Sequence, residues 1–116
     1  MASVAINNTQ LSWNTAAALP TAVAVDAADG ALITPGDASR TLIILENAAV
    51  SAKNATIVAG NGFFGMDDTV VSVPGNGRLV LQVQSGRFVN FSGPNKGCIL
   101  VKGADADIRV ACLLLP

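Results

Sequence analysis

Residues 78–91 read RLVLQVQSGRFVNF, and this stretch is the one from which the fold is predicted. Every second residue from 79 to 83 is apolar, and a period of two is typical of a strand that turns one face to a core. Ser85-Gly86 then favours a tight reversal, because glycine tolerates the positive φ that such turns need. We therefore expect a β-hairpin whose second strand includes Phe88 and Val89, with the other strands added to it.

Short segments of similar character recur on both sides of this hairpin. They are residues 21–26, 31–34, 41–46, 55–59, 69–73, 98–102 and 108–114. Residues 41–46 (TLIILE) are apolar on both faces, as expected of a central strand. Turn residues separate the segments, most clearly the PGNG at 74–77. About eight or nine short strands without a convincing helix predict an all-β, single-domain, antiparallel β-sandwich, jelly-roll-like, over residues 21–116.

Residues 1–20 keep no sustained period and are rich in Ala, Asn and Thr. A helical turn could begin at Asn14, but Pro20 would stop it. We expect an extended N-terminal arm that lies on another molecule and uses Trp13 as its large anchor. A disordered tail is the alternative that composition leaves open.

The composition is apolar and poor in charge. Hydrophobic residues make up 51% of the 116 residues and charged residues 13%, and the mean hydropathy is +0.51. Ordinary globular proteins carry about 25% charged residues. A free monomer of this size needs a charged surface to stay apart from its neighbours. We therefore expect an assembly subunit, a homo-oligomer, with much of its surface covered by other protein.

The same features argue against several partner classes. The net charge is -1 and the 7 basic residues are scattered singly, so no nucleic-acid partner is expected. No apolar run approaches the roughly 18 residues of a membrane helix, so no membrane partner is expected. The opening residues MASVAINNTQ lack the basic and apolar regions of a secretion signal, and we expect folding in a reducing compartment.

Residues 60–65 (GNGFFG) fit the G-x-G-x-x-G pattern of dinucleotide-binding loops. That chemistry needs a helix N-terminus after the third glycine and an acidic residue about 20 positions on, and neither is apparent. We therefore expect an interstrand loop and no cofactor. The adjacent Phe63 and Phe64 cannot easily both face inward, so with Met66 they are candidate protein contacts. Ordinary core packing is the alternative.

Two acidic groups, Asp67-Asp68 and Asp105-Ala106-Asp107, could serve as a carboxylate pair or as ligands of a hard cation. A calcium site needs more oxygen ligands at a fixed spacing, which is missing here. Aspartates in turns commonly accept local backbone hydrogen bonds, and we expect that role. The chain has no His, which excludes Ser-His and Cys-His mechanisms in their ordinary forms. We expect no metal, no catalytic residue and no enzyme activity.

Cys98 and Cys112 are expected to face each other. If residues 98–102 and 108–114 form a closing hairpin in which Lys102 pairs with Ile108, Cys98 lies opposite Cys112. Two buried thiols side by side are then expected. A cross-strand disulfide is the alternative, which a reducing compartment disfavours.

The order of elements resembles that of small head proteins of tailed bacteriophages, of the kind that decorate or cement the capsid shell. The residues that carry the resemblance are a turn-rich lead at 25–40 (VDAADGALITPGDASR), the strand TLIILENAA, Ala59-Gly60, Asp68 before a VxVP strand at 71–74, Gly86-Arg87-Phe88 and the final apolar strand. Residues 1–24 fit no such pattern.

The resemblance implies a non-enzymatic β-sandwich on the capsid surface of the virion, often a trimer, that clamps neighbouring subunits of major capsid protein together. Such a protein is synthesised in the host cytoplasm and stabilises the assembled lattice, because it binds the lattice and not the free subunits. Trp13, Phe63, Phe64 and Met66 are then the expected lattice or subunit contacts.

Two other classes stay open. One is a carbohydrate- or ligand-binding β-sandwich, which normally presents several Trp or Tyr platforms, whereas this chain has one Trp and no Tyr. The other is a different phage structural part, such as a tail or head-fibre module, which composition cannot separate from a capsid cement.

Overall fold

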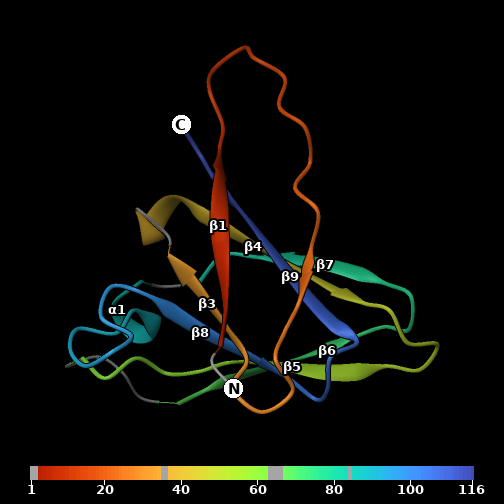
Figure 1. The fold of residues 1–116 in the computed structure, drawn as a ribbon. Helices are drawn as coiled ribbons and strands as arrows, with labels where there is room; N and C mark the ends of the chain where they lie inside the picture. Colours follow the sequence, from red (N-terminus) through yellow and green to blue (C-terminus); the bar gives the residue numbers. More distant parts are fainter. Residues whose placement is uncertain (1–2, 35–36, 63–66, 84) are drawn as a thin grey trace.

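The computed structural model describes residues 3–34, 37–62, 67–83 and 85–116, and its regular structure is dominated by strands (Figure 1). In chain order the elements are β1 (Val4–Gln10), β2 (Val23–Ala24), β3 (Ala31–Thr34), the 3-10 turn η1 (Ala38–Arg40), β4 (Thr41–Asn47), β5 (Lys53–Ile57), β6 (Thr69–Val73), β7 (Arg78–Leu81), α1 (Ser85–Phe88), β8 (Ile99–Gly103) and β9 (Ile108–Leu114). The predicted all-β class is confirmed. The predicted strands at 31–34, 69–73 and 108–114 coincide with β3, β6 and β9.

The strands form one mixed sheet in the order β6-β5-β8-β3-β1-β9-β4-β7, with β2 added to β9. Most neighbours are antiparallel, but β1 runs parallel to both of its neighbours. Residues 4–7 of β1 pair with β3, and residues 8–10 pair with β9. β1 thus joins two halves of a curved, nearly barrel-shaped sheet, in which β5 and β6 lie below β4 and β7 in Figure 1.

The core lies between these two halves. β4 pairs with β9 on one side and with β7 on the other, and none of its residues is exposed, which confirms the expected central strand. The largest fully buried apolar side chains come from several strands: Ile33, Ile43, Leu45, Ile57, Ile99, Ile108, Val73, Val101 and Val110. Burying one such side chain stabilises the fold by roughly 1.5–3 kcal/mol, so this cluster dominates the stability.

The hairpin predicted around residues 85–86 is wrong. β7 ends at Leu81 and pairs with β4, where Leu81 is level with Ile43, while residues 85–88 form the single helical turn α1. The turn carries Phe88 into the core, where it is 3% exposed, and the Gly60 N–H donates to the Arg87 carbonyl oxygen at 2.8 Å. Burial of the Phe88 ring and pairing of β7 with β4 therefore take the place of the reversal predicted at Ser85-Gly86.

The hairpin predicted between residues 98–102 and 108–114 is also wrong. β8 pairs with β3 and β5, whereas β9 pairs with β4, β1 and β2. The segment after β8 leads the chain to the other half of the sheet and does not turn it back along the edge of β8. A Cβ placed on Gly103 would lie 2.6 Å from the Ile108 Cβ, so glycine is needed where the two strands approach each other. Both edges of β8 and both edges of β9 are paired with other strands, so β8 and β9 are not hydrogen bonded to each other.

Cys98 and Cys112 consequently do not face each other. Cys112 is buried in β9, level with Ile43 of β4 and Asn8 of β1. Cys98 precedes β8, and its Sγ lies 3.6 Å from the Thr34 hydroxyl oxygen. Both thiols are free.

The N-terminal segment differs from the arm expected over residues 1–20. Residues 4–10 form β1, inside the sheet, and Ile6 is 3% exposed. The signal in VAINNTQ is weak because a single large side chain faces the core. Residues 11–22 leave the sheet as a long loop (Figure 1). In the part of the chain that the structure describes, no helix has the length and apolar character needed to cross a membrane.

Candidate interaction surface

Residues 11–22, named here the projecting loop, rise away from the sheet between β1 and β2 (Figure 1). Residues 12–19 are all exposed. The loop begins with a small reversal in which the Thr15 N–H donates to the Ser12 carbonyl oxygen at 3.3 Å. Asn14 has a φ of 57° there, a left-handed conformation that Asn tolerates better than most residues. The loop is therefore a defined excursion outside the core.

Both ends of the projecting loop are held on β9. The Leu11 N–H donates to the Leu114 carbonyl oxygen at 2.8 Å, and the Gln10 side-chain amide donates to the Leu11 carbonyl oxygen at the same distance. At the other end the Val25 N–H donates to the Ile108 carbonyl oxygen at 3.0 Å. These bonds fix the base of the loop and leave its tip in solvent.

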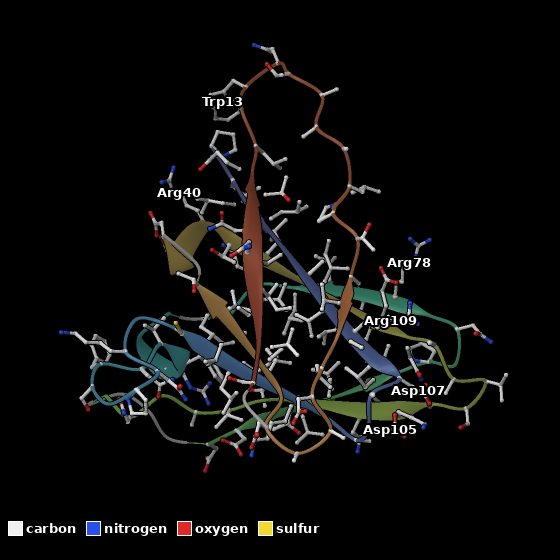
Figure 2. All side chains as sticks on the ribbon, in the orientation of Figure 1. Trp13, Arg40, Arg78, Asp105, Asp107 and Arg109 are labelled. Carbon is white, nitrogen blue, oxygen red and sulfur yellow. The ribbon has the colours of Figure 1, made fainter. Side chains whose placement is uncertain are left out.

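The tip presents large apolar side chains. Trp13 is 78% exposed and Leu19 is 77% exposed. Figure 2 shows Trp13 near the top of the loop, far from the body of the protein. No side chain in residues 1–25 is ionisable. Trp is among the side chains enriched in the residues that dominate protein interfaces, so this uncharged tip is a candidate docking element.

Other exposed apolar side chains stand singly among the described residues. They are Val23, Val50, Val70, Val80 and Phe91. Scattered exposed valines are normal on a protein surface and define no site. Among these residues Val50 is the most exposed, at 89%, and it lies in the connection between β4 and β5. Sequence reasoning selected Trp13 but missed Leu19, whose signal is an isolated large apolar residue before Pro20 in a run of small residues.

Phe63, Phe64 and Met66 lie outside the described residues, so their expected contacts stay a prediction. The structure does explain the first two glycines of GNGFFG. A Cβ on Gly60 would collide with the Val89 carbonyl oxygen, and a Cβ on Gly62 would collide with the Phe91 ring. These glycines permit close packing against the segment after α1, a role that needs no bound nucleotide.

Asn61, between the two glycines, holds that packing in place. Its side-chain oxygen accepts hydrogen bonds from the Phe91 N–H at 2.8 Å and from the Ser92 N–H at 3.3 Å. Its amide donates to the Ser92 carbonyl oxygen at 2.9 Å. One side chain thereby satisfies three backbone groups of a neighbouring loop, which accounts for a polar residue at this position.

The acidic groups make local contacts. Lys53 donates to the Asp105 carboxylate and, at 3.0 Å, to the Asp107 carboxylate. The Asp107 N–H also donates to Asp105, at 2.8 Å. The carboxylates raise the pKa of Lys53, and the ammonium, followed by the Asp107 N–H, lowers the pKa of Asp105. The Lys53 ammonium is therefore the cation that Asp105 and Asp107 bind, at the place where the sequence suggested ligands of a metal ion.

Asp68 and Asp37 have similar structural roles. The Asp68 carboxylate accepts a hydrogen bond from the Ala59 N–H at 2.7 Å. Asp37 accepts from the Ser39 hydroxyl at 2.6 Å and from Arg40 Nε at 2.9 Å, which lowers its pKa. Within the described residues no group of three or more His, Cys, Asp or Glu side chains is arranged to hold a metal ion.

No protein-family model, no curated protein and no solved structure matches this chain. The interpretation of the surface therefore depends on its own chemistry: an uncharged loop, fixed at its base, that exposes one indole and one leucine side chain.

Proposed function

We propose that this chain is a structural virion protein that binds the outside of an assembled phage capsid and stabilises it by bridging neighbouring capsid subunits. The observation that carries the proposal is the exposure of Trp13 and Leu19 on an uncharged loop. Leaving two large apolar side chains in water is unfavourable, and covering both removes roughly 3–6 kcal/mol of that cost. The surface of a partner protein is the simplest way to shield Trp13 and Leu19 from water.

Three further features support a passive, assembled subunit. Only 13% of the residues are charged, which suits a protein whose surface is largely covered. Asp68, Asp105 and Asp107 are engaged in local contacts with backbone N–H groups or with Lys53. The resemblance to phage decoration proteins supplies the kind of partner, the major capsid protein, and favours a trimer and a jelly-roll-like sandwich as the finer description of the fold.

Mechanistically, the protein stabilises the shell by mass action. It binds the assembled lattice and not the separate subunits, so each bound copy adds its binding free energy to the assembled state. Many copies on one shell make modest individual contacts add up. We expect the binding to depend little on salt, because residues 1–25 contribute no charged side chain to the contact.

Co-sedimentation with shells assembled from a phage major capsid protein of the same source tests the proposal. Wild-type protein is expected to pellet with the shells, and Trp13→Ala is expected to weaken binding at least tenfold. Because Trp13 is the sole Trp, its fluorescence should shift to the blue on binding. Val50→Ala is the matched control, since Val50 is exposed but lies outside the loop.

Failure of the wild-type protein to bind assembled shells would contradict the capsid assignment. A blue shift of Trp13 fluorescence on titration with glycans, without shell binding, would instead support the carbohydrate-binding class.

A further inference from the structure

β1 fills a slot between two other strands. It is the strand that separates β3 from β9, and it is hydrogen bonded to both. Without β1, both neighbours would present an open edge, and unpaired edges readily accept a strand from another chain. The slot recognises backbone groups, so any copy of the same segment fits it equally well.

The side chains of β1 hold it in this slot only weakly. Ile6 is its one buried residue, while Ala5, Asn7 and Gln10 are exposed. Val4 packs at the margin of the core. Among the described strands β1 pairs only with β3 and β9, so its release from the slot leaves the other strand pairings intact.

The connection from β1 to β2 is longer than the distance between the end of β1 and the start of β2 requires. Gln10 is level with Leu114 and Val23 is level with Val110, on the same edge of β9. Four strand residues span about 13 Å, whereas residues 11–22 reach about 40 Å when extended. The surplus chain forms the projecting loop and leaves Trp13 and Leu19 in solvent. A connection of this length exceeds the 36 Å longest extents of the molecule.

We propose that copies of this chain exchange β1, so that β1 of one copy occupies the slot between β3 and β9 of a second copy, with residues 11–22 as the crossing segment. Every β1 contact is preserved, because the two slots are identical, and exchange of an identical element is a low-cost route to oligomers. The gain comes from the contacts that the two crossing segments make with each other at the junction between copies. The exchange is independent of whether the oligomer binds a capsid.

A cysteine placed at Asn8 tests the exchange. Asn8 and Cys112 are level on parallel neighbouring strands, where Cα atoms lie about 4.8 Å apart, within the range that a disulfide allows. The variant Asn8→Cys, in a Cys98→Ser background, is oxidised and analysed on a non-reducing gel and by mass spectrometry. Exchange predicts a disulfide-linked species of at least twice the 11.7 kDa chain mass. A cross-linked species of single-chain mass would overturn the proposal.

Asn7→Cys in the same background is the matched control, because Asn7 is exposed and level with Thr34, not with Cys112. A second variant lacks residues 14–18, which leaves seven connecting residues that reach roughly 23 Å. This length closes the roughly 13 Å within one chain without strain and leaves little length for a crossing to a second copy. Light scattering should give an oligomer for the wild type and a monomer for this deletion. A monomeric wild type, or a deletion that keeps the oligomer, would overturn the exchange even if the Asn8 variant does not cross-link. Shell binding is measured separately, so the two proposals can fail independently.

Discussion

The Asn47 side chain donates a hydrogen bond to the Val73 carbonyl oxygen at 3.1 Å and thereby joins β4 to β6, two strands that are not neighbours in the sheet. Asn47 is 2% exposed. Its amide also donates to the Ser51 carbonyl oxygen at 2.9 Å, and its oxygen accepts from the Ala49 N–H at 2.9 Å. One buried amide therefore holds the loop after β4 against the end of β6.

Asn47→Ala should destabilise the protein by about 2–4 kcal/mol. The change removes the side-chain partner of the Val73 carbonyl oxygen in a buried hydrogen bond, and of the Ser51 carbonyl oxygen and the Ala49 N–H in two partly buried ones. An unsatisfied buried polar group costs roughly 1–3 kcal/mol. Urea unfolding followed by circular dichroism measures the change. Asn54→Ala on β5 is the control, because Asn54 is exposed, and it should change stability by less than about 0.5 kcal/mol. Equal midpoints for the two variants would contradict the role of Asn47.

The Lys53 cluster should make stability depend on pH at both extremes. The depressed pKa of Asp105 contributes stability above its ordinary pKa of 3.8, and this is lost as pH falls through the folded value. The raised pKa of Lys53 contributes stability below its ordinary pKa of 10.5, and this is lost as pH rises through the folded value. The stability gap between wild type and Lys53→Met should therefore be widest between these limits.

Urea unfolding at a series of pH values checks this profile. Lys102→Met, at an exposed lysine on β8, is the control. Its difference in stability from the wild type should be smaller and should not change with pH in this way. A Lys53→Met gap that is as wide at pH 2 as at neutral pH would contradict the assignment.

The two thiols should react at different rates. Burial raises the pKa of the Cys112 thiol to about 11, and the thiolate is the reactive form, so about one in 1,000 is reactive at pH 8. Cys98 is only partly buried. A thiol reagent should label Cys98 in the folded protein and both thiols after unfolding without reductant. Equal rates in the folded state, or no label after unfolding, would contradict the structure.

Gly60→Ala should destabilise the protein by about 1–3 kcal/mol, because the new methyl group meets the Val89 carbonyl oxygen. Gly93→Ala is the comparison: no atom lies within 4 Å of its Cβ, and only its φ of 82° opposes the change. Thermal unfolding of both variants measures the difference. A Gly60→Ala protein that is as stable as wild type would show that this loop does not pack as described.

The candidate surface was only partly predictable from sequence. Trp13 stands out because it is the single Trp in a segment without charge, and this segment does carry the exposed tip. The strand in residues 4–10 is not visible in the sequence, because only Ile6 marks its inward face. Its place in the sheet depends on β3 and β9, which come later in the chain.

The amino-acid sequence alone determined the place of several strands and turns, such as β6 and the turn that follows it, because the alternation in 69–73 and the proline and glycines in 74–77 act over a few neighbouring residues. It also determined the low charge, which is one of the grounds on which we propose an assembled protein. Only the tertiary structure decided which strands pair: β7 with β4, and β8 and β9 with partners other than each other. Backbone edges are nearly alike in every strand, so the partner is chosen by the burial of side chains such as Phe88 across the whole core.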